Sequence, residues 1–109
     1  MKYFCRDHER EGTCYHEFQR GKWDGSSHWK ADSLCIDDDV MIAIGLDALL
    51  ARCIPGYDPW GPTAVLLAQW NEVCRLSKQS GGPVAEALEE ADRWARADAG
   101  MTEFTILGI

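Results

Sequence analysis

The sequence predicts an α+β domain in which a small, mostly antiparallel sheet packs against three α-helices. The first 36 residues are polar and aromatic and are interrupted by glycine and serine, a pattern typical of short strands joined by turns. Residues 40–96 contain three segments with apolar residues at helical spacing, separated by loops rich in proline and glycine. The chain has 109 residues, of which 46% are hydrophobic, so we expect one domain, residues 1–109, with one core.

The N-terminal third is expected to form three strands of this sheet. Apolar and polar residues alternate loosely along each of them, which favours strands with one buried and one exposed side. The expected strands are Lys2–Arg6, Cys14–Gln19 and Trp29–Ile36. The pattern changes near Asp37, where helical spacing begins.

The first helix is expected to run without a break over Val40–Ile54. The three consecutive aspartates before it suit a helix start, because an aspartate can cap the first turn and its charge is favourable at the positive end of the helix dipole. In an alternative interpretation, Val40–Ile44 is a buried strand and the helix begins only at Leu46. Short apolar runs do not distinguish these two structures.

The second helix should follow the loop Pro55–Pro62, whose prolines and glycines end the first helix and stiffen the connection. Pro62 is expected at the first helical position, where its missing N–H costs nothing. The helix should end near Lys78. Its apolar stripe is expected to comprise Leu66, Leu67, Trp70, Val73, Cys74 and Ser77.

The third helix should begin at Pro83, after a second glycine loop, and end where Gly100 takes a left-handed conformation. Its expected buried stripe is Val84, Ala87, Leu88, Ala91, Trp94 and Ala95. Two ion pairs are expected on its exposed side, Glu89 with Arg93 and Asp92 with Arg96, at about 0.2–0.5 kcal/mol each. The segment Phe104–Ile109 is apolar on both faces, which predicts a strand inside the sheet rather than at its edge.

The expected cellular compartment follows from the charged N-terminal residues and from the number of cysteines. The first residues are charged and do not resemble a secretory signal, and no stretch approaches the roughly 20 apolar residues that span a bilayer. We therefore expect a soluble, cytoplasmic protein that does not enter a membrane. Its five cysteines, an odd number, are expected to be reduced thiols.

The whole net charge of −7 lies in residues 37–109. Residues 37–61 carry five aspartates against a single arginine, whereas the first 36 residues are balanced. A nucleic-acid binder normally needs a basic stripe to neutralise phosphates, so direct nucleic-acid binding is not expected. A basic protein partner would be favoured electrostatically.

Cysteine and histidine gather in the N-terminal third, at Cys5, His8, Cys14 and His16. Thiolates and imidazoles are the ligands that zinc prefers, so these residues are candidate zinc ligands of a small adaptor domain. Their spacing matches no established zinc pattern, and we therefore expect no cofactor. Cys14 with His16 or His28 would be the best pair for a small cysteine-dependent enzyme, although no signature of such enzymes surrounds them.

Asp37, Asp38 and Asp39 have two further interpretations besides charge complementarity. Consecutive carboxylates occur in Mg²⁺ sites, but no second acidic motif follows here, and helix capping explains the run without a metal. Asp47 lies among apolar residues of the first helix. It is expected either to reach solvent or a hydrogen-bond donor, or to be an inward acid with a raised pKa.

The best candidate binding surface is the proline-stiffened loop that carries Tyr57, Asp58 and Trp60, together with the three aspartates of residues 37–39. Tyrosine and tryptophan are enriched in binding hot spots, and a stiff loop loses little entropy on association. In the alternative, Trp60 folds back and covers the ends of the helices. The leading hypothesis is a stoichiometric inhibitor of a basic protein, of the kind represented by immunity proteins of toxin–immunity pairs and by phage-encoded inhibitors. The zinc-stabilised adaptor and the cysteine-dependent enzyme are the alternatives.

Overall fold

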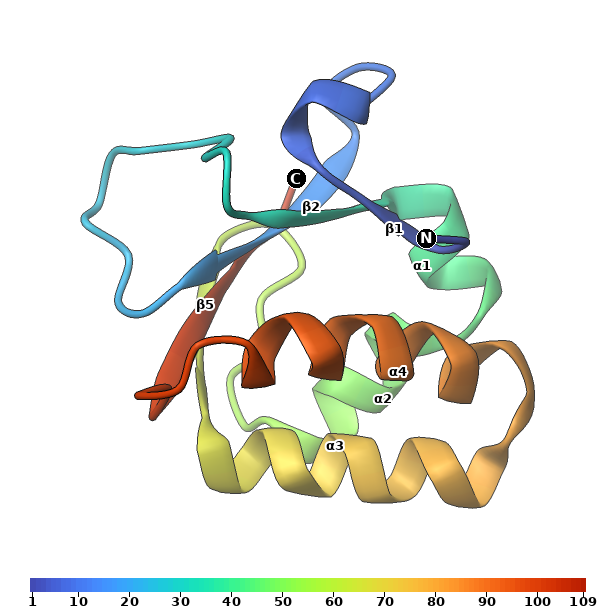
Figure 1. The fold of residues 1–109 in the computed structure, drawn as a ribbon. Helices are drawn as coiled ribbons and strands as arrows, with labels where there is room; N and C mark the ends of the chain where they lie inside the picture. Colours follow the sequence, from blue (N-terminus) through green and yellow to red (C-terminus); the bar gives the residue numbers. More distant parts are fainter.

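A computed structural model describes residues 1–109 and shows a five-stranded sheet with four α-helices (Figure 1). The strands are β1 (Phe4–Cys5), β2 (Tyr15–Arg20), β3 (Leu34–Asp37), β4 (Pro62–Leu66) and β5 (Glu103–Leu107), and one 3-10 turn, η1 (Asp7–Glu9), follows β1. The helices are α1 (Asp38–Ala43), α2 (Leu46–Cys53), α3 (Leu67–Ser80) and α4 (Gly82–Arg96). The predicted α+β class is confirmed.

The strand order is β1-β3-β2-β5-β4, and every neighbouring pair is antiparallel. The C-terminal strand β5 lies between β2 and β4, with Phe18 opposite Ile106 on one side and Val65 opposite Phe104 on the other. This confirms the prediction of an interior C-terminal strand. None of the helices combines the length and apolar character needed to cross a membrane.

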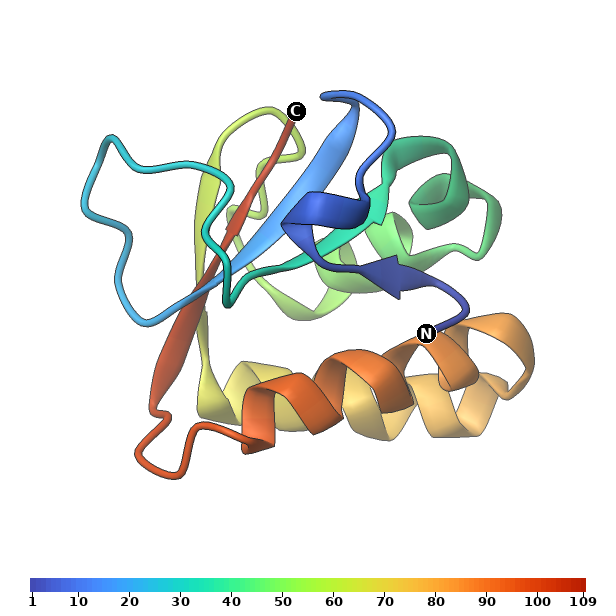
Figure 2. The ribbon, with the colours of Figure 1, turned by 45° about the horizontal axis from the view of Figure 1, so that its top comes forward.

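The helices cover one face of the sheet. Figures 1 and 2 show α3 and α4 side by side under one end of the strands, with α1 and α2 beside them. The Phe18 ring lies at the centre of the core, 6.4 Å from the ring of Trp70 on α3, 6.3 Å from Trp94 on α4 and 5.8 Å from Phe104 on β5. Such aromatic pairs contribute about 0.5–1.5 kcal/mol beyond the area they bury. The core therefore joins the N-terminal strands to the last two helices and the last strand.

The opposite face of the sheet carries several polar side chains, and loops cover part of it. Gln19 donates from Nε2 to the Ser27 carbonyl oxygen at 2.8 Å, and the Thr105 hydroxyl donates to the Gly21 carbonyl oxygen at 2.9 Å. Both contacts tie the long loop between β2 and β3 to the strands. This loop is seen at the left of Figure 2.

The first predicted helix is in fact two helices, so the sheet packs against four α-helices rather than three. Gly45 separates α1 from α2 and has a φ of 78°, a left-handed conformation that glycine adopts at little cost and that interrupts a helix. Asp37 caps α1, because its carboxylate accepts hydrogen bonds from the N–H groups of Asp39 at 2.8 Å and Val40 at 3.2 Å. The capping interpretation is confirmed, and the alternative strand over Val40–Ile44 is wrong.

Pro62 begins a strand and not a helix, which corrects the predicted start of the second helix. Leu66 is the last residue of β4 and is 51% exposed, so it does not belong to the buried stripe of α3. Trp70, Val73, Cys74 and Ser77 are buried there as expected. A proline after a turn suits the first residue of an edge strand as well as the first turn of a helix, because neither position needs its N–H.

Two other boundaries differ from the prediction. The strand expected over Trp29–Ile36 is limited to β3, because Trp29 has a φ of 58° and residues 29–33 form a turn. The last helix ends at Arg96 with Ala97 in a right-handed conformation, so Gly100 does not cap it. The buried stripe of α4 is confirmed except for half-buried Val84. Of the two expected ion pairs on this helix, only Asp92 with Arg96 forms, at 3.0 Å.

Candidate functional site: the Trp60 loop

Residues 57–61, here called the Trp60 loop, lead from α2 into β4. The Trp60 side chain is 73% exposed, the highest exposure among the large hydrophobic residues of the chain. The alternative in which Trp60 folds back over the helix ends is therefore wrong. An exposed indole on a connection between two ordered elements is a candidate contact residue.

The Trp60 loop is held by hydrogen bonds at both ends. The Asp58 carboxylate accepts from the Trp60 N–H at 2.9 Å, and the Asp58 N–H donates to the Thr63 hydroxyl at 2.9 Å. The chain after β5 crosses the loop, where the Gly108 N–H donates to the Gly61 carbonyl at 2.9 Å. The approach is close, since a Cβ on Gly108 would lie 2.2 Å from the carbonyl oxygen of Pro59. The exposed indole thus stands on a fixed backbone.

Tyr57 and Asp58 have structural roles within this loop. The Tyr57 ring packs against the hydrophobic core, and its hydroxyl is buried without a hydrogen-bond partner. Burial raises the pKa of Tyr57 to about 12, and the carboxylates of Asp47, Asp38 and Asp58 add to this shift in that order. Tyr57 is therefore an inward anchor of the loop, and only Trp60 is presented to solvent.

The aspartates of residues 37–39 separate into three roles. Asp37 caps α1, as described above, and Asp39 is exposed. Asp38 bonds the Nε2 atom of buried His16 at 2.7 Å, which leaves His16 Nδ1 buried without a partner. A carboxylate only accepts, so Nε2 of His16 carries the hydrogen. No group of three or more metal-ligating side chains forms here or elsewhere in the chain.

Several carboxylates nevertheless act electrostatically on Tyr57 at the base of the Trp60 loop. Asp38 on α1, Asp47 on α2 and Asp58 in the loop all act on the Tyr57 hydroxyl electrostatically. Asp47 is half-buried, and its carboxylate forms no hydrogen bond or ion pair with another residue. Carboxylates from three elements, α1, α2 and the Trp60 loop, therefore contribute to the electrostatic field at Tyr57.

Strand β4 extends this surface with a row of apolar residues that the sequence analysis did not identify. Pro62, Ala64 and Leu66 are exposed, whereas Thr63 and Val65 between them are buried. The alternation in five residues is the signal of an edge strand with one free face. Leu66 also fits the spacing of the following helix, so the sequence alone does not separate this row from α3.

The free edge of β4 offers little backbone for strand addition. The Gly108 N–H bonds the Gly61 carbonyl, and the Leu67 N–H bonds the Thr102 carbonyl, so the odd-numbered residues face β5. Of the residues that face outward, Pro62 has no N–H, and the Leu66 N–H donates to Oε1 of Gln69 at 2.9 Å. Any partner at this edge must bind mainly through side chains.

The candidate zinc ligands do not converge. Cys5 lies opposite Cys35 in the register of β1 and β3, and both are free thiols. His8 and Cys14 are exposed, and the His16 ring is directed to Asp38. His28 lies against the Trp23 ring at 5.6 Å. Neither histidine proposed to activate Cys14 forms a hydrogen bond with its thiol, so the structure gives no support to a Cys14 dyad.

The five free cysteines are expected to differ sharply in reactivity. Burial raises the pKa of Cys35 to about 12, and burial with the nearby Asp92 carboxylate raises the pKa of Cys74 to about 12, whereas Cys14 is exposed. With iodoacetamide at pH 8, Cys14 should react first, and Cys35 and Cys74 at least about a hundredfold more slowly. Peptide mass spectrometry over time measures the order. Alkylation of Cys35 or Cys74 at the rate of Cys14 in folded protein would contradict the packing described here.

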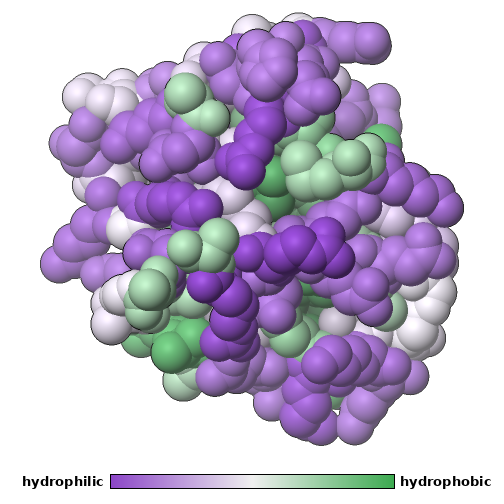
Figure 3. All heavy atoms as spheres, viewed as in Figure 1, coloured by the Kyte–Doolittle hydropathy of each residue, from purple (hydrophilic) through white to green (hydrophobic).

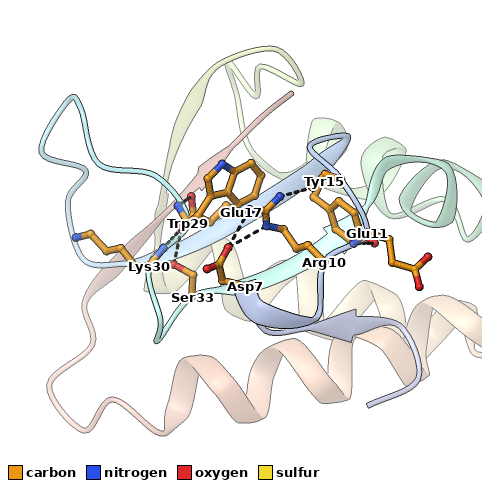
Figure 4. Close-up of polar contacts among 9 residues, drawn as sticks. Asp7, Arg10, Glu11, Tyr15, Glu17, Trp29, Lys30 and Ser33 are labelled. Carbon is orange, nitrogen blue, oxygen red and sulfur yellow. Dashed lines mark hydrogen bonds and ion pairs between the residues drawn. The ribbon is translucent and has the colours of Figure 1, made fainter.

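A second polar cluster, shown in Figure 4, orders the loop on the opposite face of the sheet. The buried Glu17 carboxylate accepts from the N–H of Trp29 at 2.8 Å, the N–H of Lys30 at 2.9 Å and the hydroxyl of Ser33 at 2.6 Å. The Arg10 guanidinium lies 3.5 Å from the centre of the Trp29 ring. These contacts hold Trp29 in its left-handed conformation. Glu17 is fully engaged and has no free oxygen directed to a ligand.

The chain matches no model of a known protein family, no curated protein and no solved structure. Its function therefore has to be inferred from the geometry of the Trp60 loop, β4 and the surrounding carboxylates.

Proposed function

We propose that this domain binds a basic protein partner through the Trp60 loop and acts as a stoichiometric inhibitor by covering the partner's functional surface. The observation that carries the proposal is the exposure of Trp60 on a fixed backbone. Burying an indole of this size releases a large apolar area from water, and tryptophan is among the residues most enriched in hot spots. Because the loop is already ordered, little conformational entropy is lost on binding.

The charge distribution supports a basic partner. Asp38, Asp39, Asp47 and Asp58 lie in the acidic segment of residues 37–61, and three of them act electrostatically on Tyr57 at the base of the loop. Complementary charges at the rim of an interface mainly accelerate association, while a central aromatic residue slows dissociation. Inhibition of the kind that immunity proteins and phage-encoded inhibitors perform needs both properties, because the inhibitor must reach its target quickly and remain bound.

The apolar row on β4 supplies the area that a single tryptophan lacks. Pro62, Ala64 and Leu66 continue along β4 from the Trp60 loop, and all three are exposed. A specific interface buries roughly 800 Å² on each partner, which is far more than one side chain. We place Trp60 at the centre of the contact, this row on one side and the carboxylates on the other.

Charge reversal at Asp39 is expected to slow association with the partner by roughly three- to tenfold at low salt, with little effect on dissociation. Asp39 is chosen because its side chain is exposed and unbonded, whereas Asp58 holds the Trp60 loop. The partner is identified by capture on immobilised protein from the source cells, and its association with Asp39→Lys is followed by surface plasmon resonance at 50 and 500 mM salt. Salt at the higher concentration should remove most of the difference.

The matched control is Glu89→Lys, which makes the same charge change at an exposed position on α4. It should slow association less than Asp39→Lys does. Thermal unfolding checks both variants, because a lysine at the start of α1 loses about 0.3–1 kcal/mol of helix-dipole stabilisation. If both charge reversals slow association equally, the effect comes from the net charge of the protein and not from the acidic segment near the Trp60 loop. A partner that is not basic would contradict the proposal.

A further inference from the structure

A cavity of about 260 Å³ lies between the N-terminal strand, the start of β3 and helix α4, away from the Trp60 loop. Three arginines line it, Arg6, Arg20 and Arg93, together with the indole of Trp94. Three guanidinium groups around one cavity are unexpected in a chain with a net charge of −7. In Figure 3 the face between β1 and α4 is dominated by hydrophilic side chains, with small apolar areas between them.

Two of the three arginines, Arg6 and Arg20, are held in place mainly by backbone carbonyls. Arg6 donates from Nη1 to the carbonyl oxygens of Asp32 at 3.1 Å and Ser33 at 3.2 Å. Arg20 donates from Nη1 to the Trp94 carbonyl at 3.0 Å, and its guanidinium lies 4.5 Å from the centre of the Trp94 ring. The carboxylate of Asp32 is 3.9 Å from Arg20 Nε and is largely exposed. These contacts orient two guanidinium groups, of which only Arg20 has a carboxylate within ion-pair distance.

The one acidic residue that lines the cavity, Glu90, already accepts hydrogen bonds from the backbone of the N-terminal strand. The Glu90 carboxylate accepts from the backbone N–H groups of Lys2 at 2.9 Å, Tyr3 at 3.1 Å and Phe4 at 3.0 Å. It fixes the N-terminal strand on α4 and leaves little acceptor capacity for the arginines. Arg93 forms no ion pair or hydrogen bond within the protein, so all five of its N–H groups are free.

We propose that this cavity binds a small oxyanion of the phosphate class. Guanidinium forks match the oxygens of phosphate, and such charge-assisted hydrogen bonds are about twice as strong as neutral ones. The volume lies just below the range of about 300–1,000 Å³ typical of drug-sized ligands, which suits a phosphate group with at most a small substituent. Trp94 and the buried side chain of Leu34 supply an apolar wall for that substituent. The site is independent of the proposed binding of a basic protein.

The test is a titration of the full chain with inorganic phosphate at constant ionic strength, followed by ¹H–¹⁵N NMR at the Arg20 Nε–H and the backbone amides of residues 93–97. Phosphate should shift these signals with saturation, and chloride should not. Arg93→Gln should weaken phosphate binding at least about tenfold, because it removes a charge-assisted contact. The Arg93 side chain is exposed and forms no hydrogen bond or ion pair within the protein, so this variant should keep the fold.

The matched control is Arg52→Gln, the same substitution at an exposed position of α2 outside the cavity. Its phosphate affinity should equal that of the unmodified chain. Phenyl phosphate is titrated in parallel: tighter binding than phosphate assigns the site to a phosphorylated organic molecule, and equal binding assigns it to the free anion. The proposal is overturned if no signal near the cavity saturates with either probe, or if Arg93→Gln and Arg52→Gln bind phosphate equally.

Discussion

Removal of residues 104–109 is expected to abolish cooperative folding. Strand β5 lies between β2 and β4, so its loss would separate β4 from the rest of the sheet and expose the edge of β2. Phe104, Ile106 and Leu107 are each at most 4% exposed, and burying each such side chain contributes about 1.5–3 kcal/mol. Their sum approaches the 5–15 kcal/mol of total stability that is usual for a domain.

The measurement is thermal and urea unfolding followed by circular dichroism. The truncated chain should show no cooperative transition, while a control chain that lacks only Ile109 should keep one. Ile109 lies beyond β5 and is 37% exposed, so the control removes the same end without removing the strand. A truncated chain that melts cooperatively near the temperature of the full chain would mean that β5 does not bind the sheet together.

The parts of the fold that were predictable have strong local signals. Apolar residues occur on both faces of the C-terminal segment, which favours a strand inside the sheet over one at its edge. Helix α4 has apolar residues at a spacing of three and four over its whole length, and Asp37 caps α1 through its own side chain. Each of these patterns depends only on residues close together in the sequence, so the sequence alone predicts the element.

The parts that were not predicted depend on small differences or on distant residues. A glycine inside a helix costs only about 1 kcal/mol, so the sequence did not show that Gly45 divides the first helix. Trp29 is held in a turn by Glu17, twelve residues earlier in the chain, and this contact has no local pattern. Strand β4 begins at a proline that is followed by alternating buried and exposed positions, and a proline at this point suits the first turn of a helix equally well.

The candidate site was predictable in its location but not in its details. Proline and glycine around Tyr57, Asp58 and Trp60 marked the loop as stiff and exposed in part. Which aromatic side chain points inward depends on the packing of the core, which places Tyr57 inside and Trp60 outside. The exposed row on β4 was hidden by its overlap with the helical spacing of α3, and the arginine cavity brings together residues far apart in the sequence.

Replacing Trp60 by alanine should weaken binding of the basic partner at least about 30-fold, which corresponds to roughly 2 kcal/mol. The loss should lie mainly in a faster dissociation rate, because an aromatic anchor acts after the complex has formed. The free protein should keep its melting temperature, since the indole is 73% exposed and its backbone N–H still bonds Asp58. Trp60→Phe keeps an aromatic ring at the same position and should recover most of the affinity.

The most direct test of the proposed function is therefore the dissociation constant of the captured partner for the unmodified chain, Trp60→Ala and Trp60→Phe, measured by isothermal titration calorimetry. The same titration gives the stoichiometry, which should be one to one, and the partner's activity should fall in proportion to the protein added. We predict a loss of at least about 30-fold for the alanine variant and a loss of less than about fivefold for the phenylalanine variant. Unchanged affinity for Trp60→Ala, with binding lost instead when Cys5, His8, Cys14 or His16 is replaced, would contradict a Trp60-centred inhibitor.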